Sequence, residues 1–187
     1  MALETTFRDL SMQLHLLHDS LDALQTTIGD HPEDRGSALV DALDASVLDM
    51  LSTLHEAQTA ALDAQRGVAS PLDLDRTRRA LMICHERVLG IGKQFANDLA
   101  SYDKLWELVR LGNERGDEWL AWAGGTKEAI EECRQPLEEL NRTVARCWQE
   151  IAEHAGATSV SVRTTTIGQR IVPRPAEAAD LGYERVP

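Results

Sequence analysis

The first thirty residues place apolar side chains at alternating intervals of four and three residues, with polar residues between them. Such spacing is the heptad pattern of a helix that buries one stripe against other helices. The stripe contains no polar residue: Leu3, Phe7, Leu10, Leu14, Leu17, Leu21, Leu24 and Ile28. It ends before Pro32, which cannot continue a helix, and Gly29 supplies a cap. The pattern predicts a long first helix.

A second helix is expected from Ser37, a favourable N-cap, to a break between Gly67 and Pro71. Ser70 and Pro71 then predict the N-cap and first residue of a third helix. The apolar stripe of this helix slips by one residue between Ile91 and Leu99, and the helix ends near 112–116. A fourth helix follows, with interruptions expected at Gly124–Gly125 and a kink at Pro136.

Four heptad-patterned helices joined by short loops are typical of an up-down-up-down bundle. The fold class predicted is therefore all-α, an antiparallel four-helix bundle over residues 1–156 in which the last two helices are the longer ones. Gly90 and Gly92 lie beside the stripe of the third helix, where we expect them to allow a close approach of a neighbour.

The C-terminal residues 157–187 differ in character from the rest of the chain. Residues 159–173 are rich in Val, Thr and Ile, which is the composition of a strand, and the remainder has that of an extended tail. The tail either stays unstructured, pairs with a copy of itself, or adds to the edge of a partner's sheet. For the binding alternatives the expected anchors are Val160, Val162, Ile167, Ile171 and Val172.

Charge and composition narrow the classes of partner. The net charge of −12 disfavours binding to nucleic acid or to an anionic membrane surface. There is no apolar run long enough to cross a bilayer and no basic-then-apolar leader. The three scattered cysteines fit no disulfide framework and favour a reducing compartment. We expect a cytoplasmic protein.

Motifs for catalysis are absent from the sequence. A di-metal bundle needs Glu and His pointing inward, whereas the apolar stripes contain no Glu. The cysteines fall on core positions, where a thiol acts as a small hydrophobe. We expect no enzyme activity and no cofactor. The weak candidates for a metal site are the histidines that flank the stripes: His15, His18, His55 and His85.

The aromatic residues concentrate where the two long helices should extend beyond the first hairpin. Residues 101–128 would form a two-helix tip carrying three of the four tryptophans, and an exposed aromatic patch usually marks an interface. The alternative is that the first hairpin reaches higher and buries them. The residues expected to contact a partner here are Tyr102, Trp106, Val109, Trp119 and Trp122.

The leading hypothesis from the sequence is a non-enzymatic helical adaptor or scaffold subunit. It would bind protein partners, or copies of itself, through the aromatic tip and the strand-forming tail. The alternative is a bundle that binds a small ligand or a metal and acts as a sensor or regulatory subunit. A third possibility is a subunit that switches at its glycine pair and proline.

Overall fold

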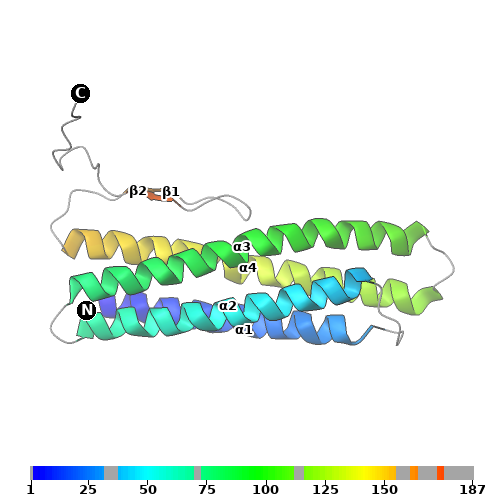
Figure 1. Ribbon diagram of the computed structural model, residues 1–187, viewed down its shortest axis with the longest axis horizontal. Coiled ribbons are helices and arrows are strands. Elements are labelled where there is room, and N and C mark those ends of the chain that lie inside the picture. Colours follow the sequence, from blue (N-terminus) through cyan, green and yellow to red (C-terminus); the bar gives the residue numbers. More distant parts are fainter. Residues whose placement is uncertain are drawn as a thin grey trace, which may run out of the picture.

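The computed structural model describes residues 2–31, 38–69, 73–111, 116–154, 161–163 and 172–174. It contains four helices, α1 (Ala2–Gly29), α2 (Ala38–Ala69), α3 (Leu74–Leu111) and α4 (Gly116–His154), and two short strands, β1 (Ser161–Arg163) and β2 (Val172–Arg174). The helices lie side by side, and successive helices run in opposite directions (Figure 1). An all-α four-helix bundle is therefore confirmed for the helical part.

Contacts between neighbouring helices are uneven. The most extensive are between α2 and α3 and between α1 and α4, followed by α1 with α2. Helices α3 and α4 contact each other least among the four neighbouring pairs. The bundle thus consists of two closely packed pairs, joined tightly along α1 and α2 and more loosely along α3 and α4.

The core is the apolar stripe that the heptad pattern predicts. All eight residues of the stripe in α1 are buried, with exposed fractions of 3% or less. Similar stripes from the other three helices complete one continuous apolar cluster. Each buried Leu, Ile or Phe side chain contributes about 1.5–3 kcal/mol relative to an exposed one, so this cluster supplies most of the stabilisation.

Polar contacts flank the core and set the pairing of the helices. The Thr6 hydroxyl lies 2.6 and 2.7 Å from the two carboxylate oxygens of Glu150, and Arg146 forms an ion pair with Asp9 at 3.1 Å. These contacts join the start of α1 to the end of α4. Between α2 and α3, the Ser46 hydroxyl donates to Asp98 at 2.7 Å.

The turn between α2 and α3 ends later in the chain than the sequence indicates. Helix α2 ends at Ala69, within the break predicted between Gly67 and Pro71. The N-cap of α3 is Asp73, whose carboxylate accepts from the Arg76 N–H at 3.1 Å, so the helix begins at Leu74, later than the sequence predicts. Ser70 and Pro71, the cap and first residue expected from the sequence, lie outside the described residues. The Asp73 N–H also donates to the Gly67 carbonyl at 2.8 Å, which closes the turn.

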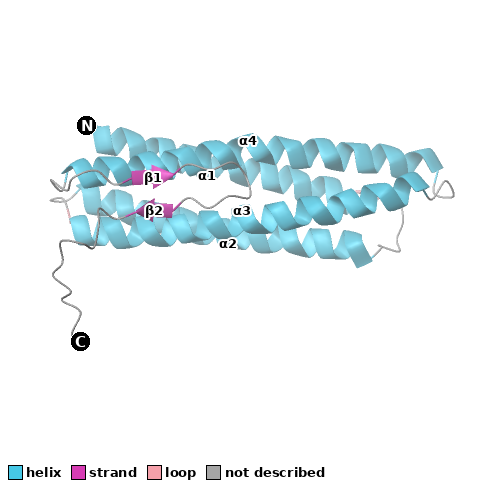
Figure 2. Ribbon diagram, turned by 90° about the horizontal axis from the view of Figure 1, so that it is seen from above, coloured by secondary structure: helices cyan, strands magenta, loops and turns pink. Residues whose placement is uncertain are grey.

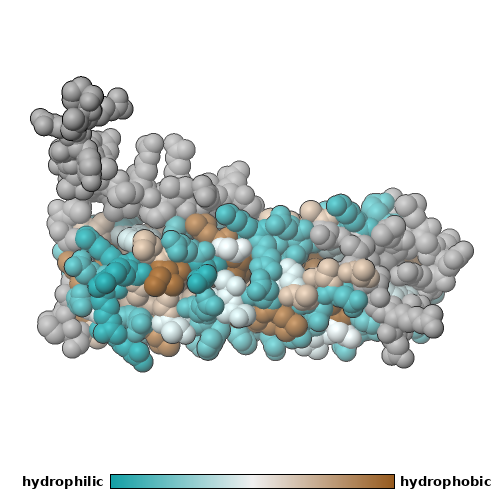
Figure 3. All heavy atoms as spheres, in the orientation of Figure 1, coloured by the Kyte–Doolittle hydropathy of each residue, from teal (hydrophilic) through white to brown (hydrophobic). Residues whose placement is uncertain are grey.

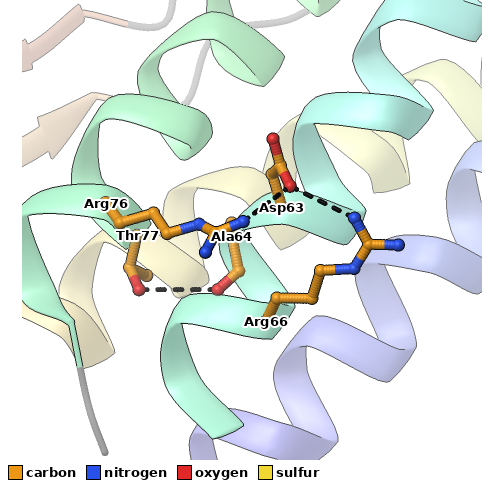
Figure 4. A network of polar contacts seen from close by, with 5 residues as sticks. All are labelled: Asp63, Ala64, Arg66, Arg76 and Thr77. Carbon is orange, nitrogen blue, oxygen red and sulfur yellow. Dashed lines mark hydrogen bonds and ion pairs between the residues drawn. The ribbon is translucent and has the colours of Figure 1, made fainter. Parts of the chain in front are cut away.

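Side chains across this turn hold the two helix ends together (Figure 4). Asp63 of α2 accepts from Arg76 of α3 at 3.1 Å, and the Thr77 hydroxyl donates to the Ala64 carbonyl at 3.4 Å. Thr77 is fully buried beside Gly67. A Cβ at Gly67 would lie 2.4 Å from the Thr77 hydroxyl oxygen, so this turn requires a glycine.

Helix α4 is continuous through the positions where interruptions were expected, Gly124–Gly125 and Pro136. The prediction that α3 and α4 are the longer helices is confirmed, with 38 and 39 residues against 28 and 32. The close approach expected at Gly90 and Gly92 is not found, since an added Cβ would meet nothing within 4 Å at either position.

The strands β1 and β2 pair antiparallel, with Val162 opposite Pro173. Both views place the pair over the face of the bundle formed by α3 and α4 (Figures 1 and 2). Val162 and Val172 of the predicted anchors therefore lie in strands; Val160, Ile167 and Ile171 fall outside the described residues.

Candidate functional site

The aromatic cluster at the start of α4 packs against the end of α1. The Trp122 indole N–H donates to the Thr27 carbonyl at 2.9 Å, which fixes α1 beside α4 at this level. The rings of Trp119 and Trp122 meet edge-on with centroids 5.2 Å apart. His31, just beyond α1, lies 6.4 Å from the Trp119 ring and 6.5 Å from the Trp122 ring. The end of α1 thus covers one side of both tryptophans.

Helix α3 contributes Tyr102 to the same cluster. Its hydroxyl donates to the Ala123 carbonyl of α4, and its side chain is 2% exposed. Burial, with a smaller contribution from the charge of Asp103, raises the pKa of Tyr102 to about 12. The hydroxyl is therefore a structural donor at neutral pH.

This packing corrects the expectation of an exposed aromatic tip. Tyr102 and Trp119 are 2% exposed and Trp122 is 8% exposed, so all three belong to the core. Trp106 is half-buried, and the side chain of Val109 lies outside the described residues. Of the aromatic residues predicted to contact a partner, only Trp106 keeps a substantial exposed surface.

A second exposed apolar residue at this end is Leu120, which is 40% exposed. The antiparallel register that brings Tyr102 to Ala123 places Leu120 within one residue of the level of Trp106 along the two helices. Trp106 and Leu120 are the exposed apolar surface among the side chains that the structure describes at this end. Leu120 follows Trp119 in the sequence and therefore points away from the core stripe.

The histidines proposed as weak metal ligands are not brought together. His15 and His18 lie on the outer side of α1, and His55 is exposed on α2. The His15 ring contacts the Ser11 carbonyl at 2.7 Å, within its own helix. His85 is buried in α3. Within the described ranges, no group of three or more His, Cys, Asp or Glu side chains could hold a metal ion.

The cysteines lie in the core as free thiols: Cys84, Cys133 and Cys147. Burial raises the pKa of Cys84 and of Cys133 to about 12, with a further contribution from Glu132 in the second case. Burial also raises the pKa of Cys147, and nearby Cys84 adds to the effect. Since the thiolate is the nucleophile, these groups are poorly suited to catalysis.

The exposed large apolar side chains are distributed over all four helices: Met12, Leu16, Leu48, Leu62, Met82, Ile83 and Leu120. On the face shown in Figure 3 the apolar residues stand as separate spots among hydrophilic ones. Single exposed apolar residues are normal on a protein surface. No continuous apolar patch marks a binding site on the described part of that face.

Among the described residues, the strand pair has one edge that is open to a further strand. In an antiparallel pair, a residue opposite its partner either exchanges two hydrogen bonds with it or points its N–H and C=O outward. Pro173 has no N–H, so the Val162–Pro173 pair must be of the second kind. Val162 therefore presents an N–H and a C=O on the outer edge of β1, whereas proline blunts the outer edge of β2.

Comparisons with known proteins give no family assignment for the chain. The chain matches no protein-family model, and no curated protein sequence is significantly similar to it. Among the helices that the structure describes, none combines the length and the apolarity needed to cross a membrane.

Proposed function

We propose that this chain is a non-enzymatic helical scaffold subunit of the cytoplasm, which assembles through the open edge of β1. The observation that carries the proposal is the asymmetry of the strand pair: one edge presents the backbone groups of Val162, and Pro173 blunts the other. Free and buried cysteines are compatible with a reducing compartment.

The small size of the sheet supports the proposal, because a two-stranded sheet is only marginally stable by itself. Adding a strand to the edge of β1 would satisfy the outward groups of Val162 and enlarge the sheet. The simplest partner is the same edge of a second copy, since two β1 strands in antiparallel pairing give a four-stranded sheet with twofold symmetry. A protein partner with an open strand edge could use the same site.

The distal end of the bundle provides a smaller second contact. The exposed surface of Trp106 and Leu120 is apolar, and tryptophan is favoured at the centre of interfaces. This exposed surface is smaller than the aromatic patch that the sequence predicts, because the other aromatic side chains are buried in the core. We therefore assign the main interaction to the strand edge.

Co-purification of two differently tagged full-length copies tests the proposal. Val162→Pro deletes the outward N–H of β1, whereas the matched control Val162→Thr retains it and is also β-branched. We expect capture of one copy by the other with the native and threonine chains and at least a tenfold loss with the proline chain. Equal capture by all three would refute assembly through β1.

A further inference from the structure

Two of the three cysteines lie toward the same end of the bundle, on the neighbouring helices α3 and α4. Cys84 is ten residues after Leu74, where α3 begins, and Cys147 is seven residues before His154, where α4 ends. At about 1.5 Å per residue these intervals are about 15 Å and about 10 Å. Since the start of α3 and the end of α4 lie at the same end of the bundle, the two thiols are at similar depths within it (Figure 1).

Both thiols also point into the same core. Cys84 and Cys147 belong to the apolar stripes of their helices and are 0% exposed. The Cys147 thiol donates to the Thr6 carbonyl of α1 at 3.9 Å, which locates it in the interior of the bundle. Cys84 raises the pKa of Cys147 beyond the effect of burial, and such an effect requires the two groups to be close together. The two thiols therefore form one cluster within the core.

The third cysteine, Cys133, does not belong to this cluster. It precedes Cys147 by fourteen residues in α4, which is about 20 Å along the helix. Cys133 is also a free thiol and is 0% exposed. It therefore differs from the other two in position and not in exposure, which makes it a matched control.

The seam between α3 and α4 controls access to the two thiols. In the closed bundle, burial raises the pKa of Cys84 to about 12, so very little thiolate forms at neutral pH. Helices α3 and α4 contact each other least among the neighbouring pairs, and weakly packed elements separate most readily. Separation of these two helices would bring both sulfurs into solvent at once and lower the pKa of each thiol toward its ordinary value.

We propose that Cys84 and Cys147 are a redox-sensitive pair, which a hydroperoxide converts into a disulfide that links α3 to α4. In the open state, one thiolate attacks an oxygen of the peroxide, the O–O bond breaks, and the sulfur becomes a sulfenic acid. The second thiolate attacks that sulfur, the S–O bond breaks and the S–S bond forms. Each step releases hydroxide, which takes up the proton of one thiol. Two thiols and one molecule of hydrogen peroxide thus give one disulfide and two molecules of water.

The disulfide would join the two helices where they contact each other least. It would also close a long loop, from residue 84 to 147, and so restrict the unfolded chain. Oxidation should therefore stabilise the bundle, and a thiol reductant should reverse the effect. The pair lies outside β1, so this regulation goes beyond the proposed function and does not depend on it.

Mass spectrometry of the full-length chain tests the proposal. The protein is treated with hydrogen peroxide and unfolded, and its remaining thiols are blocked with N-ethylmaleimide. We expect the loss of two hydrogens, one blocked thiol, and a peptide map in which the peptide of Cys84 is joined to that of Cys147. The oxidised chain should unfold at a temperature about 5 °C or more above that of the reduced chain, and dithiothreitol should remove the difference.

Two serine variants identify the partners in the disulfide. Cys133→Ser should form the same disulfide as the native chain, whereas Cys84→Ser should form none within the chain. Circular dichroism before oxidation establishes that both variants retain their helices, and the peptide map of the native chain needs no variant. A disulfide through Cys133, sulfurs that stay free or oxidise without joining, or equal unfolding temperatures of the oxidised and reduced chains would overturn the proposal. Co-purification reports assembly through β1 separately.

Discussion

At the residue scale, the aromatic side chains near the start of α4 show how one contact decides whether a residue belongs to the core or to an interface. Trp119 and Trp122 look like interface anchors in the sequence, because tryptophans on a protruding hairpin would have no core to enter. The hydrogen bond from Trp122 to the Thr27 carbonyl places the end of α1 against them. They are therefore structural residues of the monomer.

Replacement of Trp119 by alanine tests this assignment. Trp119 is 2% exposed, so Trp119→Ala should lower the free energy of unfolding by about 3–5 kcal/mol. Trp106→Ala, at a half-buried position, should cost clearly less. Urea unfolding followed by circular dichroism measures both. Equal and small losses in the free energy of unfolding of both variants would show that Trp119 is not a core residue.

A second residue-scale prediction concerns Asp98, whose pKa is raised by burial, while the hydrogen bond from Ser46 opposes the rise. The ionised carboxylate is less favourable in the folded than in the unfolded chain, where its pKa is the ordinary value of 3.8. The contribution of Asp98 to stability is therefore full below pH 3.8 and is lost as pH rises through the folded pKa. Asp98 is only partly buried, so solvent reduces the size of this effect.

Asp98→Asn removes this titration. The free energy of unfolding of the variant relative to the native chain should increase with pH from below 3.8 to neutrality. Ser46→Ala removes the opposing hydrogen bond, so in that background the increase should be larger. Urea titrations at several pH values between 3 and 7 measure the difference. A difference that does not change with pH in either background would contradict this account of Asp98.

At the element scale, the helices themselves are predictable from sequence and their ends are not. The stripe of α1 is a local pattern, and every residue in it is buried as predicted. Both Ser70 and Asp73 are good N-caps, and the choice between them depends on the turn in which the Asp73 N–H meets the Gly67 carbonyl. That contact joins two helices, so no pattern within either helix encodes it.

Two glycines inside helices should respond in opposite ways to alanine. Gly67→Ala would place a Cβ 2.4 Å from the Thr77 hydroxyl oxygen, so the turn must shift, at a cost of about 1–3 kcal/mol. Gly92→Ala meets nothing within 4 Å and should stabilise α3 by up to about 1 kcal/mol. Thermal unfolding of the two variants measures both effects. A stabilising Gly67→Ala would show that the turn is looser than described.

At the scale of the whole molecule, the sequence predicts the antiparallel bundle because each helix carries a sustained apolar stripe. It does not predict how far α1 extends beside α4, which decides whether the tip is exposed. The looser packing of α3 and α4 also emerges only when the helices are placed together. The strand character of Val162 was predictable, and the open edge follows only from its pairing with Pro173.

The central claim, assembly through β1, is tested most directly by the mass of the full-length protein in solution. Light scattering should give a dimer at high concentration for the native chain and for Val162→Thr, and a monomer of 20.7 kDa for Val162→Pro at the same concentration. All three chains should have the same helix content, since Val162 lies outside the bundle. A native chain that stays monomeric, or a dimer that persists with Val162→Pro, would contradict self-assembly through the edge of β1.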